Sequence, residues 1–261
     1  MLRTSAVIVD IEYSPSREVT FVRFQPEEPF EFQEWQFMMI ESIFLHEDLG
    51  KPLKKPYSIA TTNEELQEKW TLGVIVKKTL NGYMSDYLTQ GIQVGDKVIL
   101  AGPAGHMIDQ GERNHYLLVS TGSGVSPMVG LYNELKKNPH NKISNLFGER
   151  YMKNLLPSVV QDFSEQTEQI KNILCLSQEE VLNTQNLKLK TSKGRIQSQL
   201  DEALSFLWEW SNAEIQNLTL KTQNFSSVSV FLCGAPEMVD DVKKILIEKW
   251  IPKEQIKSEK Y

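Results

Sequence analysis

The feature that most constrains this chain is an apolar run followed at once by a glycine-rich turn and a helical pattern. Residues 116–119 read Tyr-Leu-Leu-Val, which is typical of a buried strand in a parallel sheet. The segment Thr121-Gly122-Ser123-Gly124-Val125-Ser126-Pro127 comes next, and a helical pattern continues to Lys137. Glycines let the backbone approach a phosphate, and free amides at a helix N-terminus favour anions. The segment therefore indicates a nucleotide-binding loop, although an ordinary strand-to-helix connection could have the same composition.

The remainder of the second half repeats this alternation. Further apolar runs predict buried strands at residues 143–147, 173–176 and 227–232. Helical patterns alternate with them at residues 155–165, 196–210 and 238–250. Alternating strands and helices predict an open, Rossmann-like parallel sheet with helices on both faces.

The first hundred residues have a different pattern of predicted elements. Short strand patterns separated by Gly, Pro or polar turns occur at residues 6–12, 19–24, 37–40, 57–60, 72–76 and 98–101. One short helix is expected at residues 84–89. This spacing predicts a small antiparallel β-barrel. We therefore expect a two-domain β plus α/β protein, with a barrel domain at residues 1–111 and a nucleotide-binding α/β domain at residues 112–261.

Composition excludes several classes of protein. The net charge is −6, so no global basic field exists to bind nucleic acid. Two cysteines are too few for a four-thiolate iron–sulfur cluster, and the four histidines have no metal-ligand spacing, so we expect no metal site. No apolar run approaches the roughly 20 residues of a membrane helix. The first residues lack the pattern of a signal peptide, and a cytoplasmic location is the expectation.

Several short motifs follow one another along the chain, and each alone could be an ordinary turn or helix cap. They are Lys55-Pro56-Tyr57-Ser58, Gly82-Tyr83-Met84-Ser85, Gly102-Pro103-Ala104-Gly105, the glycine loop, Phe147-Gly148-Glu149-Arg150, Cys233-Gly234-Ala235-Pro236 and Glu259-Lys260-Tyr261. In this order they resemble the motifs of the ferredoxin-NADP reductase family of flavoproteins, and the likeness spans nearly the whole chain. The ending Glu-x-Tyr is similar to that of plant-type members.

The resemblance implies hydride exchange between a nicotinamide and the N5 atom of a bound flavin, with single electrons passing to or from a separate carrier. That carrier would be a ferredoxin, a flavodoxin or an oxygenase component. FAD is the implied cofactor, and NADH or NADPH is the implied co-substrate. The protein's part is mainly to hold the reacting atoms close together and aligned.

The resemblance also implies roles for individual residues. Tyr57 would cover one face of the flavin ring, and Ser58 would hydrogen-bond near N5. Lys55, Ser85 and the amides from Met84 onward would hold the flavin phosphates. The implied cofactor-binding set is Lys55, Pro56, Tyr57, Ser58, Val76, Lys77, Gly82, Tyr83, Met84, Ser85, Thr121, Gly122, Ser123, Gly124, Val125, Pro127, Arg150, Ser177, Cys233, Gly234 and Tyr261.

The implied catalytic residues are Ser58, Cys233, Glu259 and Tyr261. Cys233 would lie beside the nicotinamide C4, and Glu259 would join a hydrogen-bond network that relays a proton to the flavin. Tyr261 would stack on the flavin face that the nicotinamide must occupy, and so act as a gate. A buried packing residue at 233 and a surface tail at 261 are the alternatives.

Two positions depart from the family pattern. Lys55 replaces an arginine, so a point charge replaces a bidentate donor and FMN is not excluded. Trp35-Gln36-Phe37 stands where many members have Gly-Gln-Phe. We expect an altered turn at Trp35 with the following strand retained.

The choice between NADH and NADPH depends on the residues after Ser177. The sequence continues Gln178-Glu179-Glu180, whose carboxylates would repel a 2′-phosphate, so NADH is favoured. The cations Lys188, Lys190, Lys193 and Arg195 would compensate if a loop returned them to this point. The alternative is that these cations only solvate a surface loop.

The partner expected from the resemblance is an electron-carrier protein. Repulsion between this acidic chain and an acidic carrier could be overcome by a local basic face at Lys51, Lys54, Lys77 and Lys78. A different class of function stays open: a non-catalytic subunit that binds flavin or nucleotide for regulation or assembly. Lys55 favours that alternative, and the residues expected around flavin N5 argue against it.

Overall fold

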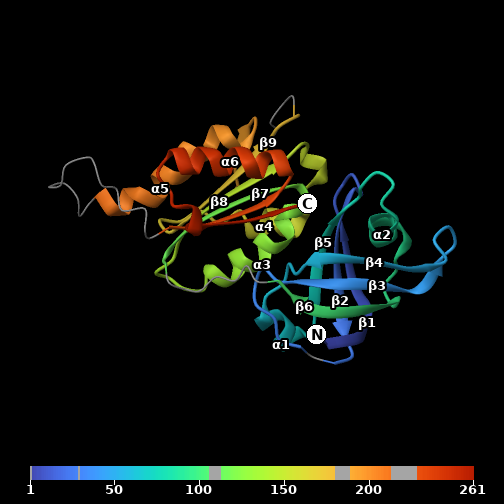
Figure 1. Cartoon of the computed structure of the whole chain (residues 1–261). Coiled ribbons are helices and arrows are strands. Elements are labelled where there is room, and N and C mark those ends of the chain that lie inside the picture. The colour runs from blue at the N-terminus through green and yellow to red at the C-terminus, as the bar shows by residue number, and fades with distance from the viewer. Residues whose placement is uncertain (1, 29, 106–112, 180–188, 213–227) are drawn as a thin grey trace. The chain divides into compact units, whose positions relative to one another are not determined.

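The chain divides into two compact units (Figure 1). The computed structural model describes residues 2–28, 30–105, 113–179, 189–212 and 228–261. The first unit comprises Met1–Asp109, Ser126–Glu134 and Lys153–Pro157, and the second comprises Gln110–Val125, Leu135–Met152 and Ser158–Tyr261. The expected domain boundary after residue 111 lies outside the described residues.

The first unit is built on an antiparallel sheet of six strands. They are β1 (Leu2–Tyr13), β2 (Val19–Pro26), β3 (Phe37–His46), β4 (Lys51–Ser58), β5 (Leu72–Lys77) and β6 (Lys97–Ala104). Their order is β4-β3-β6-β1-β2-β5. The two end strands meet beyond Ser58 through an antiparallel bridge between Ile59 and Val74. The sheet therefore curls back on itself, which confirms the predicted antiparallel barrel architecture.

Alternating side chains of these strands fill the core of the first unit. Ala6 and Ile8 on β1 and Val98 and Leu100 on β6 have at most 1% of their surface exposed. Helical segments between the described strands of the barrel are α1 (Asn63–Lys69), α2 (Tyr83–Asp86) and the π-helical turn η1 (Tyr87–Gly91), and Ser126–Glu134 of helix α3 (Val125–Leu135) also belong to this unit. The segments α2 and η1 confirm the helix expected at residues 84–89.

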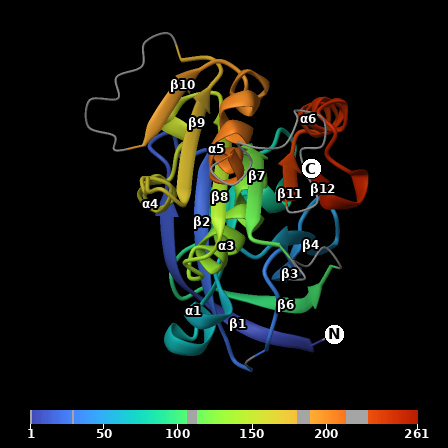
Figure 2. The ribbon, with the colours of Figure 1, turned by 90° about the vertical axis from the view of Figure 1, so that its left-hand side faces the viewer.

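The second unit is built on a parallel sheet. Its strands are β7 (His115–Thr121), β8 (Lys142–Glu149), β9 (Ile170–Leu176), β10 (Lys190–Lys193), β11 (Val228–Gly234) and β12 (Ile256–Lys260). In Figure 2 these strands follow one another in the order β10-β9-β8-β7-β11-β12. All five pairings are parallel, as predicted.

Helices occupy the connections between these strands. They are α3 (Val125–Leu135), α4 (Pro157–Asp162), α5 (Leu200–Asn212) and α6 (Pro236–Glu248), with 3-10 turns η2 (Gly122–Gly124), η3 (Met152–Asn154), η4 (Ile196–Gln199) and η6 (Lys253–Gln255). Every residue of β8 and β11 is buried, as expected for inner strands of a parallel sheet. One hydrophobic cluster joins these strands to α5 and α6, through residues such as Leu204 and Val242. No helix in the described parts of the chain is long and apolar enough to span a membrane.

Some elements differ from the expectation. Residues 57–60 were expected to be a strand, but β4 begins earlier, at Lys51, and ends at Ser58. The strands β10 and β12 were not predicted, because their sequences KTSK and IKSEK carry no apolar run. Both are end strands of the sheet, where backbone pairing needs only one neighbour.

The turn at Trp35 was expected to change, and its conformation shows how. Trp35 has φ of +80°, in the left-handed region that glycine adopts most readily. Its side chain is only 1% exposed, so the ring is part of the core. Strand β3 begins two residues later, at Phe37, so the following strand is retained as predicted. The tryptophan therefore keeps a glycine-like backbone and adds a large buried side chain.

Candidate functional site

The carboxyl ends of the parallel strands bring most of the second unit's predicted residues to one edge of the sheet. Thr121 ends β7, Arg150 follows β8, Ser177 follows β9, Gly234 ends β11 and Glu259 lies near the end of β12. The chain runs outward from β7 through β8, β9 and β10, then returns to place β11 on the other side of β7. The switch point therefore lies between β7 and β11, where open α/β sheets bind their ligands.

At the switch point the ends of β7 and β11 approach each other very closely. The backbone amide of Ala235 donates to Thr121 Oγ1 at 3.2 Å. A β-carbon added to Gly234 would lie 2.2 Å from that same oxygen. Gly234 has φ of +143°, a conformation that side chains rarely adopt. Glycine is therefore required at 234 both by space and by backbone conformation.

The glycine loop itself begins directly after Thr121. Gly122 has φ of +55° and starts the 3-10 turn η2, which leads into helix α3. A β-carbon at Gly124 would lie 2.3 Å from the carbonyl oxygen of Cys233. No side chain among the described residues caps η2. Backbone of the loop is therefore packed against the end of β11, in a strand–turn–helix arrangement typical of phosphate-binding turns.

Arg150 and Ser177 lie side by side after neighbouring strands. The amide of Ser177 donates to the Glu149 carbonyl at 3.0 Å, and the amide of Gln178 donates to the Arg150 carbonyl at 3.0 Å. These bonds extend the β8–β9 ladder past the strand ends. The Arg150 side chain is exposed, so its guanidinium is open to an anion at this edge.

The charged residues that follow Ser177 in the sequence lie at two different places in the fold. Glu179 accepts a hydrogen bond from the Met152 amide at 2.9 Å, which holds this carboxylate near the end of β8. Lys190 forms an ion pair with Glu202 of α5, and Lys171 binds the same carboxylate at 2.6 Å. Glu180 and Lys188 lie outside the described residues. Glu149 Oε1 accepts from the Arg150 amide at 2.7 Å, so the carboxylates of both Glu149 and Glu179 are held at this end of β8.

Cys233, Glu259 and Tyr261 come together at the other side of the switch point. Cys233 pairs with Glu259 across β11 and β12. The Tyr261 hydroxyl donates to Glu259 Oε2 at 3.3 Å, and the Tyr261 amide donates to the Gly234 carbonyl at 3.1 Å. Burial raises the pKa of the Cys233 thiol; a hydrogen bond with Tyr261 opposes the rise and Glu259 adds to it. Cys233 is therefore a neutral thiol at pH 7 and not a thiolate nucleophile.

The predicted flavin residues of the first unit lie at the ends of β4 and β5. Ser58 is 5% exposed and Val76 is 1% exposed, whereas Lys55 is exposed. Burial raises the pKa of the Tyr57 hydroxyl, so this ring is neutral at any physiological pH. Lys77 ends β5 opposite Val19. The neutral Tyr57 ring therefore lies next to the cation Lys55 at the end of β4, a combination that suits a flavin ring and its phosphates.

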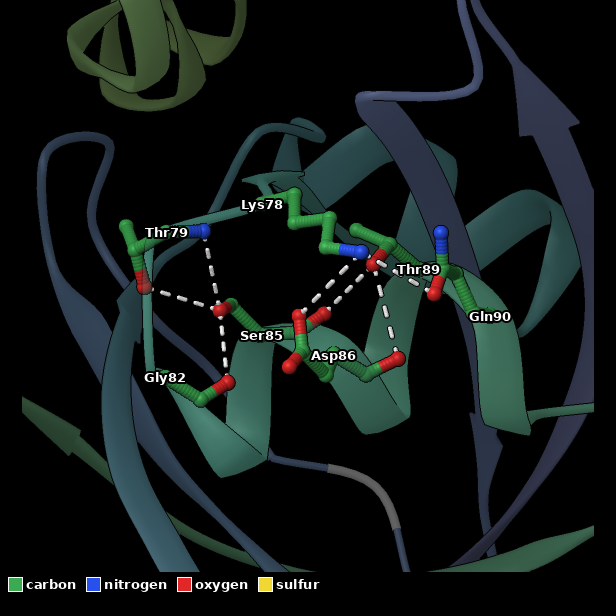
Figure 3. A network of polar contacts seen from close by, with 7 residues as sticks. All are labelled: Lys78, Thr79, Gly82, Ser85, Asp86, Thr89 and Gln90. Carbon is green, nitrogen blue, oxygen red and sulfur yellow. Dashed lines mark hydrogen bonds and ion pairs between the residues drawn. The ribbon is translucent and has the colours of Figure 1, made fainter.

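Helix α2 begins in a tight loop closed by the Ser85 hydroxyl (Figure 3). Ser85 Oγ donates to the Gly82 carbonyl at 2.8 Å and accepts from the Thr79 amide at 3.1 Å. A β-carbon at Gly82 would lie 2.1 Å from Thr79 Oγ1, so only glycine fits this loop. Lys78 Nζ donates to Gln90 Oε1 at 3.1 Å and forms an ion pair with Asp86, and both contacts are drawn in Figure 3. The Ser85 hydroxyl is thus hydrogen-bonded within the loop.

The loop leaves the first backbone amides of α2 available to a ligand. No described side chain caps the first turn, where Gly82 is the N-cap residue. The first amides of a helix have no intrahelical partner, so those of Tyr83, Met84 and Ser85 can donate to an anion. These three backbone amides, together with the tight turn at Gly82, fit a flavin phosphate.

One contact of the glycine loop is not indicated by the sequence. The Ser126 hydroxyl donates to the Ser58 carbonyl at 2.7 Å. Both residues belong to the first unit. Their separation of 68 residues leaves no local signal that could have indicated the pairing. No group of three or more His, Cys, Asp or Glu residues within the described ranges could hold a metal ion.

Comparison with known families gives two matches that divide the chain between them. The family described as "Oxidoreductase FAD-binding domain" matches residues 8–108. The family described as "Oxidoreductase NAD-binding domain" matches residues 118–244. The matches coincide with the barrel and with most of the parallel sheet, in the order that the sequence motifs predicted.

Curated relatives are similar over nearly the whole of this chain. One component of the 1,2-phenylacetyl-CoA epoxidase from Escherichia coli K12 is 25% identical over 97% of this chain and 65% of its own length. The reductase component of propane 2-monooxygenase from Mycolicibacterium smegmatis is 24% identical over 92% of this chain and 63% of its own length. The chain thus spans a little less than two thirds of the length of these two relatives.

Solved structures share the fold. The ferredoxin reductase of carbazole 1,9a-dioxygenase superposes with a TM-score of 0.74 at 18% identity, covering 98% of this chain and 68% of that one. A ferredoxin NADP+ reductase from Neisseria gonorrhoeae with bound FAD and NADP gives a TM-score of 0.71 at 18% identity, covering 99% and 98%. Two separate comparisons therefore agree with the architecture derived above.

Proposed function

Because this chain belongs to the ferredoxin-NADP reductase family of flavoproteins, we propose that it is an FAD-dependent NAD(P)H oxidoreductase. The bound flavin would exchange hydride with a nicotinamide at N5 and single electrons with a separate carrier. The observation that carries the proposal is the switch point between β7 and β11, where Gly124 and Gly234 bring the glycine loop and the end of β11 into close approach. Such an edge suits a dinucleotide.

In the first unit, we assign Tyr57 and Ser58 to the flavin ring. Tyr57 is neutral and largely buried, so it can cover one ring face without adding charge. Ser58 can hold a hydrogen bond near N5, and Pro56, Val76 and Lys77 line the adjoining strand ends. Positioned donors of this kind assist only if they match the geometry of the reacting atoms.

The flavin phosphates are assigned to Lys55 and the amides of Tyr83, Met84 and Ser85. This modifies the role that the family resemblance implied, because the Ser85 hydroxyl is bound to the Gly82 carbonyl. Lysine is a point charge and gives weaker geometric discrimination than arginine. FMN in place of FAD therefore stays an alternative that chemical identification of the bound flavin can decide.

In the second unit, the nicotinamide nucleotide is assigned to the edge formed by Thr121, Gly122, Ser123, Gly124, Val125, Pro127, Arg150, Ser177, Cys233 and Gly234. Free amides of the loop would hold the pyrophosphate. Glu179 lies on the same ladder as Arg150 and would repel a 2′-phosphate, which supports NADH. Lys190 is engaged with Glu202 and is not available to offset that repulsion.

We assign Cys233, Glu259 and Tyr261 to the reacting end. The neutral thiol of Cys233 would fill space beside the nicotinamide C4. Glu259 and Tyr261 are already hydrogen-bonded to each other, which supports a proton-relay group. Tyr261 is 53% exposed, an exposure that suits a ring displaced by an arriving nicotinamide.

The partner in this proposal is an electron-carrier protein such as a ferredoxin, a flavodoxin or an oxygenase component. The relatives named above are components of oxygenase systems, which supports a partner of that kind. We also propose a division into a flavin domain at residues 1–111 and a nucleotide domain at residues 112–261, and a cytoplasmic location. Two free, buried cysteines are compatible with a reducing compartment.

The test is an anaerobic titration of the flavin-loaded protein with NADH and then NADPH, followed by loss of the oxidised flavin absorbance. Rapid bleaching by NADH, and much slower bleaching by NADPH, is the expected result. Equal bleaching by both would overturn the preference for NADH alone. A protein that retains flavin but is bleached by neither nucleotide would instead be a non-catalytic binding subunit.

A further inference from the structure

The two end strands of the barrel part from each other next to Ser58. The antiparallel bridge between Ile59 and Val74 marks their closest pairing. On one side of it, the Ala60 amide donates directly to the Gly73 carbonyl at 2.8 Å. The seam between β4 and β5 is thus closed by backbone at this point.

On the other side of the bridge, one side-chain hydroxyl contacts both strands. The antiparallel register puts Ile75 opposite Ser58. The Ile75 amide donates to Ser126 Oγ at 3.0 Å, and Ser126 Oγ donates to the Ser58 carbonyl at 2.7 Å. Ser126 Oγ therefore forms a hydroxyl bridge between β4 and β5.

The hydroxyl bridge formed by Ser126 is shielded from water. Ser126 is 2% exposed, Ser58 5% and Ile75 2%. A buried amide or carbonyl without a partner is costly, so the hydroxyl satisfies two groups that water does not reach. Ser126 belongs to the first unit, as do both of its partners. One side chain therefore hydrogen-bonds to both strands of the seam beside Ser58.

The Ser126 hydroxyl bridge lies next to the residues that are proposed to bind the flavin. Tyr57 and Ser58 end β4 on one side of the opening, and Val76 and Lys77 end β5 on the other. A change in the width of the seam would move these two groups of residues relative to each other. The position of Ser58 depends most directly on the bridge, because its own carbonyl is the acceptor.

We propose that Ser126 is a positioning residue, which fixes Ser58 and the spacing of β4 and β5 for hydride transfer to the flavin. This inference rests on the proposed function. Hydride transfer is sensitive to small displacements, and a misplacement of about 1 Å can slow a reaction by about a hundredfold. Flavin affinity depends on many other contacts and is much less sensitive.

The test compares Ser126→Ala with Ser126→Thr and Thr61→Val in the full chain. Ser126→Ala removes the bridge, and Ser126→Thr keeps the hydroxyl. Thr61→Val is the matched control, because Thr61 Oγ1 accepts from the Gly73 amide at 3.1 Å in the same seam and Thr61 is 1% exposed. It removes one buried hydroxyl from the seam on the side away from Ser58.

Ser126→Ala is expected to slow flavin reduction at saturating NADH by about tenfold or more, with flavin affinity and the KM for NADH within about twofold of the parent. Ser126→Thr should restore at least half of the rate, and Thr61→Val should reduce at the parent rate. Amide exchange of Ile75, measured without flavin, should speed up in Ser126→Ala and stay slow in Thr61→Val.

A parent-like reduction rate in Ser126→Ala would overturn the inference, as would an equal slowing in Thr61→Val. Failure of the parent itself to be reduced is a separate result, since it overturns the proposed function. In that case a faster Ile75 exchange together with a shifted spectrum of the bound flavin would still support the positioning of Ser58, and an unchanged spectrum would refute it.

Discussion

Gly124 packs so closely against Cys233 that a β-carbon at position 124 would lie 2.3 Å from the Cys233 carbonyl oxygen. Backbone from the glycine loop is thereby held against backbone from the end of β11. The obstructing atoms belong to the main chain, so they cannot turn aside as a side chain can. The shape of this edge therefore depends on the absence of a side chain at 124.

Gly124→Ala is expected to displace the loop and weaken NADH binding by about tenfold or more, which corresponds to about 1.4 kcal/mol. Flavin content should be unchanged. Gly50→Ala is the control, because Gly50 has φ of +60° but nothing within 4 Å of an added β-carbon. It should cost about 1 kcal/mol of stability from backbone strain and leave NADH binding intact. Titration calorimetry that finds parental affinity in Gly124→Ala would contradict this prediction.

Ser58→Ala is expected to slow flavin reduction by about tenfold or more while changing flavin affinity only slightly, because the hydroxyl is assigned to the reacting atom. Ser42→Ala is the control: Ser42 Oγ donates to the Phe44 carbonyl at 2.8 Å and accepts from the Leu53 amide, so its loss affects stability alone. Stopped-flow reduction and flavin titration measure the two quantities. An equal loss of rate and of affinity in Ser58→Ala would remove the assigned role.

Trp35→Gly is expected to lower the free energy of unfolding by about 2 to 4 kcal/mol. Glycine relieves a left-handed backbone at φ of +80°, a gain of about 1 kcal/mol. Loss of a large buried ring costs about 3 to 5 kcal/mol. Chemical denaturation measures the difference, and a stability equal to that of the parent would mean that the strained turn costs as much as the ring contributes.

Alkaline pH is expected to destabilise the chain in part through Cys175. Burial raises the pKa of this thiol to about 12, and the nearby Glu202 carboxylate adds to the rise. A raised pKa in the folded state makes the folded form bind the proton more tightly. This stability is complete below the pKa of the unfolded thiol, near 9, and is lost as pH rises toward 12.

Cys175→Ala should therefore flatten the fall of unfolding free energy with pH, by up to about 1.4 kcal/mol per pH unit between pH 9 and 12. The comparison with the parent cancels the tyrosines and lysines that also titrate there. Denaturation at several pH values gives both slopes. Parallel curves for the two proteins would show that Cys175 does not contribute.

The inner strands of the second unit could be predicted from sequence because burial on both faces requires continuous apolar runs. Residues 116–119 and 143–147 have that pattern and lie within β7 and β8. The end strand Ile256–Lys260 reads IKSEK and has no such pattern, because its pairing with β11 uses backbone atoms. Helix α1 was also missed, although Thr62 and Glu65 form a capping box, a signal that the sequence does contain.

The candidate site likewise contains features that the sequence predicts and features that it does not. Glycines at crowded positions, such as Gly82 and Gly234, could be identified from local motifs, since the reason for glycine is a tight turn or close approach. The use of the Ser85 hydroxyl inside its loop and the contact of Ser126 with Ser58 could not. Each depends on which hydrogen-bond partner lies nearest in space, and a sequence motif does not specify that.

The order of the parallel strands has a consequence for how the chain folds while it is being synthesised. The strands β8 and β9 follow β7 along the chain and can pair with it early, whereas β11 is made much later. Thr121 and Ala235, which meet at the switch point, are 114 residues apart. Long-range parallel pairing forms slowly because a large loop must close first. The nucleotide-binding edge is therefore among the last parts to be completed, and nucleotide binding by a nascent chain would report that folding has finished.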